Sequence, residues 1–305
     1  MSNFKSAFTK DGNWYKGNLH THTTISDGLF SQQDIIRDYK EKGYDFLSIT
    51  DHNIYSNYED GIIDGILMLQ GVERDVFVTG EQFKVYHIVG ISNSDIINYE
   101  KGQKINKPDW TGMDTAQEMI DELKEHGNLA ILAHPVWSRN ELEDIISLEN
   151  LDGIEIYNYG CDVECQHGNS ELYWDSFLRR GMKVWGFATD DIHVENQKFG
   201  GWIVVKATSL TKHAISEAIY SGNFYSSSGP EFFEFYVSDN EAVVECSAVT
   251  TINYITYDHI GSCYYEDNQE ITSAKHQLNG AEKYVRVEIT DLVGRKAWSN
   301  PIFLG

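Results

Sequence analysis

Short apolar runs alternate with amphipathic stretches over the first two-thirds of the chain. The runs at 46–50, 86–91 and 129–132 are rich in aliphatic residues, which is typical of buried strands. Between such runs, apolar residues recur every three or four positions, which predicts helices. The predicted helices span residues 31–43, 115–126, 140–148, 171–180 and 211–220. Repeated strand–helix units with short strands favour a barrel of parallel strands over an open sheet with one nucleotide crevice.

From about residue 232 the pattern changes to β-type segments that are separated by polar turns. These segments are 232–237, 242–246, 252–257 and 284–289. They predict a small antiparallel β appendage after the α/β region. We therefore predict two domains, residues 1–230 and residues 231–305.

Composition excludes several classes of protein. Of the 305 residues 41% are hydrophobic and 13% aromatic, which is enough for a folded core. Acidic residues outnumber basic ones by 47 to 24, and we therefore expect no nucleic-acid polymer as partner, because that needs a basic surface. No apolar run is long enough to predict a membrane span, and residues 1–6 do not resemble a signal peptide. Four irregularly spaced cysteines fit a reduced cytoplasm, which is the predicted location.

Histidines and acids gather at the ends of the predicted strands. His20 and His22 are separated by one residue in a β-prone context, so both side chains point to the same side of the chain. Imidazole pairs held in this way are good first ligands for a divalent metal. Further metal-binding residue types stand at or just past the end of later apolar runs: Asp27, His52, Glu73, His87, His134, Asp191 and His193. In parallel barrels, chemistry collects at the carboxyl ends of the strands, so these positions predict one metal centre.

These motifs, in this order, resemble those of the PHP (polymerase and histidinol phosphatase) superfamily of metal-dependent phosphoesterases. Within it, the chain is most similar to the stand-alone proteins grouped with CehA/McbA-type metallohydrolases. The resemblance extends from Trp14 to Pro301. It implies a distorted barrel of seven βα units, with the antiparallel β appendage at its C-terminal side.

The resemblance also implies a role for each ligand and two to three bound divalent ions. One ion is held by His20, His22, Glu73 and Asp191, a second by Glu73, His87 and His134, and a third by Asp27, His52 and His193. Some members of the superfamily have histidine at the position of Asp27, so the third ion depends on a departure from their pattern. Imidazole and carboxylate ligands without a thiolate fit Zn, Mn or Fe about equally.

Two ligand positions have competitors nearby in the sequence. Asp190 competes with Asp191, and the Asp-x-His spacing to His193 favours Asp191. Glu81 competes with Glu73, which we prefer because Gly-x-Glu is the form found in the superfamily. Asp51, next to His52, is expected to orient its neighbours rather than to bind metal.

The predicted reaction is hydrolysis of a small anionic phosphorylated metabolite, such as a nucleotide or sugar phosphate. A metal pair bridged by Glu73 can generate hydroxide near neutral pH, and this metal-bridged hydroxide is the expected nucleophile. Three divalent ions against three acids leave a local charge of roughly +3, which attracts an anion despite the acidic chain. The alternatives are a carboxyl ester or carbamate metallohydrolase of CehA type, and a non-catalytic metal-stabilised binding module.

Substrate contacts are harder to predict than metal ligands. His167, in the predicted loop 159–168, is our candidate for protonating the leaving group, with an ordinary surface histidine as the alternative. Arg139 is the candidate for gripping phosphate oxygens, with a solvated loop arginine as the alternative. Weaker candidates are Tyr157, Asn158 and Lys183. The sequence predicts neither the oligomeric state nor the role of the C-terminal β region.

Overall fold

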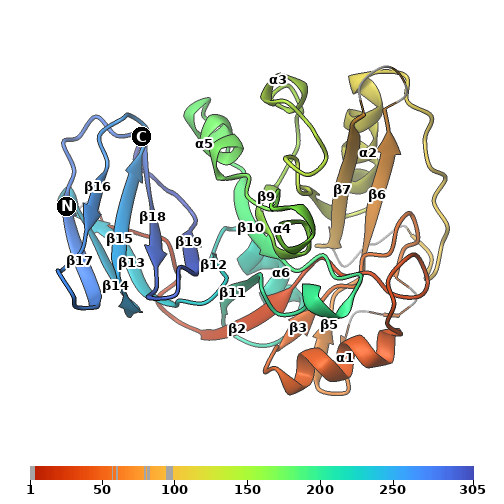
Figure 1. Ribbon diagram of the computed structural model, residues 1–305, viewed down its shortest axis with the longest axis horizontal. Helices are drawn as coiled ribbons and strands as arrows, with labels where there is room; N and C mark the ends of the chain where they lie inside the picture. Colours follow the sequence, from red (N-terminus) through yellow and green to blue (C-terminus); the bar gives the residue numbers. More distant parts are fainter. Residues whose placement is uncertain (1–3, 57, 60, 79, 81–82, 94–98) are drawn as a thin grey trace.

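The computed structural model describes residues 4–56, 58–59, 61–78, 80, 83–93 and 99–305, and its described strands form three sheets (Figure 1). The N-terminal part of the chain, from red to green in Figure 1, holds most of the helices. The blue C-terminal strands lie together on the other side of the molecule. The chain is thus a mixed α/β protein, as the apolar pattern predicted, with many strands and few helices.

The longest sheet runs through both parts of the molecule. Its order is β16-β15-β18-β19-β12-β11-β2-β3-β5-β4, with β20 paired to β18. Its strands are β2 (Asn13–Asn18), β3 (Phe46–Leu47), β4 (Gly61–Ile63), β5 (Ile66–Met68), β11 (Trp202–Ala207), β12 (Phe224–Ser227), β15 (Thr251–Thr256), β16 (Ser262–Tyr264), β18 (Tyr284–Thr290), β19 (Lys296–Ser299) and β20 (Ile302–Phe303). Strands β2, β3 and β5 pair in parallel, whereas β11 pairs antiparallel to β2.

The second sheet has five strands in the order β10-β9-β8-β7-β6. They are β6 (Gly71–Phe77), β7 (Val85–Ser92), β8 (Asn128–Leu132), β9 (Gly153–Asn158) and β10 (Trp185–Thr189). Every residue of β7 and β8 is buried, because helices and the long sheet cover both faces. This burial on both faces explains why these strands read as continuous apolar runs.

Helices connect many of the strands. They are α1 (Gln32–Glu41), α2 (Met113–Glu125), α3 (Leu142–Ile145), α4 (Tyr159–Cys165), α5 (Glu171–Arg179), the 3₁₀ helix η1 (Glu195–Gln197) and α6 (Lys212–Tyr220). Helix α1 shows how the sequence sets its bounds. The Ser31 side chain accepts a hydrogen bond from Asp34 N, and Gly43 follows the helix with a φ of 74°. Ile35, Ile36 and Tyr39 are buried on its inner face.

Two predicted connections differ from the structure. The helix predicted for 140–148 is reduced to α3, a single turn. The predicted loop 159–168 instead begins with a helix, α4, because Asn158 caps it by accepting a hydrogen bond from Cys161 N at 2.9 Å. His167 follows this helix, after Gln166 in the left-handed conformation.

A closed barrel of seven parallel βα units is not found among the described residues. Strands β6, β7 and β8 pair antiparallel, and the N-terminal strands divide between two sheets. The connection from β6 to β7, residues 78–84, is shorter than the dozen or so residues that a parallel crossover needs. The two sheets meet instead at isolated bridges, which pair Thr21 with Ile192 and His52 with Glu73.

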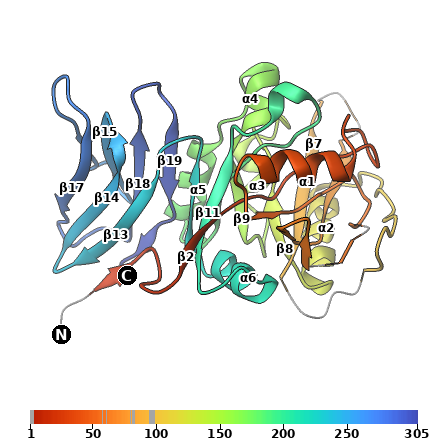
Figure 2. The same cartoon turned by 90° about the horizontal axis from the view of Figure 1, so that it is seen from below.

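The C-terminal strands form two packed layers. A sheet of order β1-β13-β14-β17, which comprises β1 (Lys5–Ser6), β13 (Phe232–Ser238), β14 (Glu241–Val249) and β17 (Ile271–Gln277), packs on the end of the long sheet. Phe235, Val244, Ile252 and Val287 lie in their shared core. Both chain ends lie at this side of the molecule (Figure 2). The boundary between residues 230 and 231 stays a prediction, since β1 and β12 of the first region also pair with these strands.

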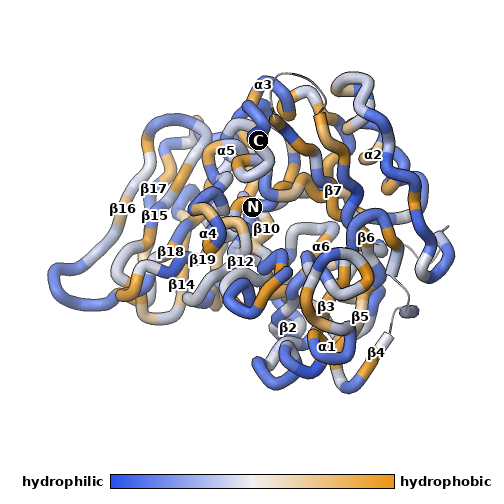
Figure 3. The backbone as a smooth tube through the Cα atoms, turned by 45° about the vertical axis from the view of Figure 1, so that its right-hand side comes forward, coloured by the Kyte–Doolittle hydropathy of each residue, from blue (hydrophilic) through white to orange (hydrophobic). Residues whose placement is uncertain are grey.

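Hydrophobic residues concentrate in the strands, and hydrophilic residues predominate in many of the outer turns (Figure 3). Within the described part of the chain, no helix is long and apolar enough to cross a membrane. The predicted cytoplasmic location stays a prediction.

Candidate metal centre

The nine side chains predicted as metal ligands come together in one cluster, where the two larger sheets meet. Every one of them belongs to at least one group of three or more side chains whose ligand atoms lie within 4.8 Å of one another. They come from segments that follow β2, β3, β8 and β10, and from β6 and β7 themselves. The segments that follow β2, β3, β8 and β10 thus converge as the sequence predicted, although the strands do not close into a barrel. The predicted strand-end position is wrong for Glu73 and His87, which lie near the starts of β6 and β7.

Backbone hydrogen bonds hold the ligand-bearing segments side by side. His22 N donates to Ile192 O at 3.1 Å, and Asp191 N donates to His20 O at 3.0 Å. Asp191 and His134 have positive φ angles of 50° and 27°, which non-glycine residues rarely adopt. Such backbone strain gathers at functional sites, where surrounding structure maintains it.

The first predicted ion has a compact set of ligands. His20 Nε2 lies 3.2 Å from Glu73 Oε1 and 3.2 Å from Asp191 Oδ1. His22 Nε2 lies 3.2 Å from Glu73 Oε2, 3.2 Å from Asp191 Oδ1 and 3.1 Å from His20 Nε2. Four ligand atoms at about 2.0–2.1 Å from a tetrahedral ion lie about 3.3 Å apart, so this arrangement fits one cation.

Beside the second predicted set lies Cys161, which the sequence did not predict to be a ligand of this centre. Glu73 Oε1 lies 2.8 Å from His87 Nδ1 and 3.3 Å from His134 Nε2. Cys161, at the start of α4, is grouped with His134 and Asp191, and its Sγ lies 3.8 Å from Asp191 Oδ2. Burial and the nearby Asp191 carboxylate raise the pKa of the Cys161 thiol well above its ordinary value. A bound cation would favour the thiolate instead.

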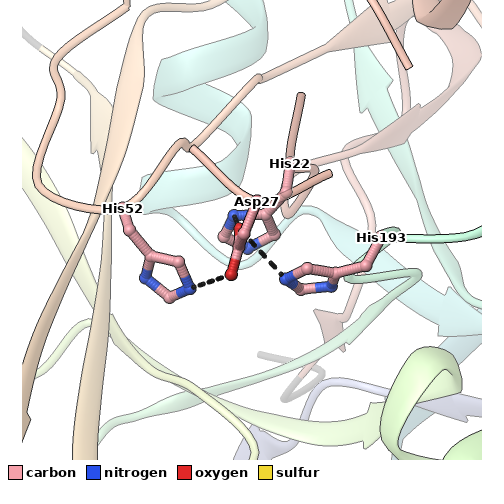
Figure 4. A group of neighbouring side chains, drawn as sticks. All are labelled: His22, Asp27, His52 and His193. Atoms are coloured by element: carbon pink, nitrogen blue, oxygen red, sulfur yellow. Dashed lines mark ion pairs between the residues drawn. The ribbon is translucent and has the colours of Figure 1, made fainter. Parts of the chain in front are cut away.

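The third predicted set surrounds Asp27, which lies between His52 and His193 (Figure 4). Asp27 Oδ2 is 3.6 Å from His52 Nε2, and Asp27 Oδ1 is 3.4 Å from His193 Nε2. His22 Nδ1 also lies 3.5 Å from Asp27 Oδ1. Because the Asp27 side chain is 53% exposed, this set is the most open of the three.

Glu155 orients two of the ligands, and sequence reasoning missed this role. Its carboxylate accepts hydrogen bonds from His20 Nδ1 at 2.7 Å, from His134 N at 3.0 Å and from Asn158 Nδ2 at 2.8 Å. With Nδ1 of His20 bonded to the carboxylate, Nε2 is left to face the other ligands. The signal in the sequence was a lone acid inside the apolar strand β9, flanked by Ile154 and Ile156.

Two aspartates next to predicted ligands have separate roles. Asp51 accepts hydrogen bonds from Thr23 N and Ser26 Oγ, at 2.8 and 2.7 Å, and so orders the turn between His22 and Asp27. Asp190 points away from the cluster and accepts a hydrogen bond from the Tyr39 hydroxyl at 2.5 Å. Asp190 also accepts from the backbone N–H groups of residues 199–201. The choice of Asp191 over Asp190 therefore agrees with the geometry, whereas the competitor Glu81 lies outside the described residues.

Three ligand atoms in the cluster are buried and have no hydrogen-bond partner among the described residues. They are His52 Nδ1, Glu73 Oε2 and Asp191 Oδ1. Burying a polar atom without a partner costs free energy, and the cost is larger for a charged carboxylate. These atoms lie 3.1 or 3.2 Å from one another or from His22 Nε2 without forming a hydrogen bond, so the donor set of imidazoles and carboxylates fits divalent cations.

The electrostatics of the cluster also favour a cation. Burial opposes ionisation of Glu73 and Asp191, yet the surrounding histidines hold the pKa of both carboxyls well below the usual range. Burial likewise lowers the pKa of His20 and His22, but the neighbouring carboxylates outweigh it and raise that of His22 to about 10. Divalent ions would replace these protons, because a ligating histidine must be neutral.

A cavity of about 780 Å³ opens above the cluster. Ligands line its floor, including Glu73, His87 and Asp191. Arg139 and His167 lie near each other, with Arg139 Nη1 3.2 Å from His167 Nε2, but neither is among the described residues that line the cavity. Their roles in phosphate binding and proton donation stay predictions.

Comparisons with known proteins extend these observations. The chain is 26% identical over 138 residues to the DNA polymerase/3′-5′ exonuclease PolX of Bacillus subtilis, covering 39% of this chain and 23% of PolX. It is 29% identical over 155 residues to the uncharacterized protein MJ1587 of Methanocaldococcus jannaschii, covering 47% of this chain and 81% of that protein. The chain thus spans less than a quarter of PolX. No family model matches the chain.

A solved structure matches the fold along nearly the whole length of the chain. It is a two-domain protein from Bacteroides vulgatus that contains a predicted PHP-like metal-dependent phosphoesterase. The two chains superpose with a TM-score of 0.51 at 16% sequence identity, and 97% of each is covered. The chain therefore has the fold of this PHP-like protein, in agreement with the resemblance that its motifs indicated. Its place among the CehA/McbA-type proteins stays a prediction.

Proposed function

We propose that this protein is a metal-dependent phosphoesterase that hydrolyses a small phosphorylated metabolite. The observation that carries the proposal is the cluster of inward-facing ligand atoms, three of them buried without a hydrogen-bond partner, at the floor of an open cavity. Burying so many acids and imidazoles in one cluster costs free energy unless cations compensate the negative charge of the acids. The PHP-like fold supports the same reaction class.

The proposed centre has its ligands in the sets described above, with Glu73 shared between the first two. When bound there, divalent ions activate water and offset the negative charge of the phosphoryl oxygens. The phosphorus–oxygen bond to the leaving group breaks, water supplies the new phosphate oxygen, and the leaving oxygen takes up a proton. The residues of the chain hold the substrate over this floor and keep the ligand rings in position.

Several side chains of the chain position the ligands in this proposal. Glu155 holds the Nδ1 proton of His20, and Ser138 Oγ lies 3.0 Å from His134 Nδ1. Asp51 fixes the turn that carries Asp27. Outer contacts of this kind set the tautomer and direction of a ligating ring.

The test is a comparison of substrates on metal-loaded protein. Phosphate monoesters, carboxyl esters and carbamates are assayed with Zn, Mn or Fe, and again after chelation. We expect turnover of phosphate esters that chelation abolishes. Turnover confined to carboxyl esters or carbamates would assign the site to the other hydrolase chemistry, and metal binding without any turnover would favour a binding module.

A further inference from the structure

The walls of the cavity are chemically unlike its floor. Above the ligands, the walls include Phe77, Phe83, Val85, Trp137 and Val194. Phe77 is 49% exposed and Phe83 is 72% exposed, so both present ring surface toward solvent at the site. Large apolar side chains at the mouth of a polar site are typical of a surface that contacts the apolar part of a ligand.

Trp137 joins the apolar wall directly to the metal ligands. Its ring packs edge-on against His134 and His87, with centroids 4.9 and 6.0 Å apart. Its indole Nε1 donates to Glu164 Oε2 at 3.3 Å, which fixes the ring from the side of α4. The organic group of a phosphate ester bound at the metal ligands would therefore lie next to the aromatic wall that Trp137 forms.

Charges on the walls do not favour a second anionic group on the ligand. Lys107 is the single lysine or arginine among the described residues that line the cavity, and it already forms an ion pair with Asp75. The Lys107 ammonium also lies over the Phe77 ring, 3.9 Å from its centroid. Asp75 neutralises Lys107 and Glu164 is a further acidic wall residue, so a second phosphate or a carboxylate would meet repulsion from Glu164.

We propose that the site takes a phosphate monoester whose leaving group is an uncharged aromatic ring, with Phe77, Phe83 and Trp137 as its contact surface. This inference rests on the proposed function and narrows its substrate class. Sugar phosphates have no aromatic ring to pack on Phe77, Phe83 and Trp137, and nucleoside di- and triphosphates carry excess charge. The bond between phosphorus and the aryl oxygen breaks, and the water oxygen takes its place on phosphorus. The phenol leaves with one proton from the water.

Binding of two phosphonates to the metal-loaded protein tests the wall without hydrolysis. Phenylphosphonate and methylphosphonate share the anionic head and differ in the ring, and calorimetry gives both affinities. We expect phenylphosphonate to bind about 10-fold more tightly or better. Phe77→Ala and Phe83→Ala should each reduce this preference about 3- to 10-fold. Phe233→Ala, which removes a 46% exposed ring from β13, is the matched control and should not change it.

Two results would overturn the inference. One is equal affinity of the wild-type protein for the two phosphonates, and the other is an unchanged preference in both Phe77→Ala and Phe83→Ala. Hydrolysis of phenyl phosphate, measured in parallel, separates this inference from the proposed function. Tight phenylphosphonate binding without hydrolysis would support the aromatic wall and contradict the phosphoesterase. Equal hydrolysis of phenyl and sugar phosphates, without the binding preference, would support the phosphoesterase and contradict the aromatic wall.

Discussion

Two buried polar clusters of this molecule differ in how their charges are compensated. The first surrounds Arg286, whose side chain is 1% exposed, between α5 and β18. Its guanidinium donates to Asp175 at 3.0 Å and to Glu288 at 2.6 Å, and it lies over the Trp174 ring. Lys296 extends the network from β19, where it lies 3.5 Å from Glu288.

The second cluster is the metal centre, where the ion pairs of Glu73 and Asp191 among the described residues are with histidines and not with lysine or arginine. Its acids Glu73 and Asp191 face histidines, and one oxygen of each is buried without a hydrogen-bond partner. No atom of the Arg286 network appears among the described buried atoms that lack a partner. The Arg286 network is therefore complete within the chain, whereas the acids and histidines of the metal centre form groups that could hold cations from outside.

This difference separates a structural cluster from a functional one. A buried charge is tolerated when a fixed partner compensates it, and Arg286 has such partners on two elements. Where the compensating charge comes from solution, the protein has a site that can be loaded and emptied. The following variants test this contrast.

The largest effect is expected from loss of the shared carboxylate. Glu73→Ala should remove two of three ions and lower kcat/KM by more than about 100-fold, the upper range for residues that only orient a ligand. Asp27→Ala should remove one ion at most, because Asp27 serves only the exposed set. Elemental analysis and phosphatase assays measure both. If Asp27→Ala strips every ion while Glu73→Ala strips none, the shared carboxylate is not Glu73.

The next effect concerns stability and should be independent of metal. Arg286→Met removes the guanidinium from the buried Glu288 and the partly exposed Asp175, so the free energy of unfolding should fall by about 3–5 kcal/mol. Urea unfolding of metal-loaded and chelated protein measures this loss. Adding Glu288→Gln should restore part of it. An ion content that falls in Arg286→Met would show that the two clusters are coupled, against the contrast drawn here.

A smaller effect is expected from the residue that orients His20. Glu155→Gln keeps the size of the side chain but removes the charge that holds the His20 Nδ1 proton. Metal affinity should fall about 10- to 100-fold, as for other outer partners of ligating histidines. Competition with a chromophoric chelator measures the affinity, and Glu164→Gln is a control on the cavity wall. Equal affinity in Glu155→Gln and wild type would remove Glu155 from the centre.

The smallest effects are expected at Arg139 and His167, which contact each other beside the cavity. If Arg139 grips phosphate, Arg139→Ala raises KM more than it lowers kcat, since the contact exists in both ground and transition states. If His167 protonates the leaving group, His167→Ala lowers kcat for alkyl phosphates more than for p-nitrophenyl phosphate. Unchanged kinetics in either variant would assign that residue to the surface.

Local sequence determined the chemistry of the centre. The spacing of His20 and His22, and acids or histidines at strand ends, follow from side-chain alternation, which acts over a few residues. Helix α1 could likewise be predicted from the sequence, because its cap at Ser31 and its end before Gly43 are local signals. The residue types of the predicted ligands, and the position of those that follow β2, β3, β8 and β10, therefore needed no tertiary information.

Only the tertiary structure decided how distant segments meet. The antiparallel course of β6 and β7 depends on a short connection and on which strand each one finds, and periodicity does not record either. Glu155 and Cys161 enter the centre because β9 and α4 pack beside Asp191, far away in sequence. Arg286 is surrounded by partners from α5 and its own strand. The contacts of Glu155 with His20 and of Arg286 with Asp175 join residues more than a hundred positions apart. Side-chain packing, rather than local pattern, therefore determines which polar groups are compensated and which are left to bind a ligand.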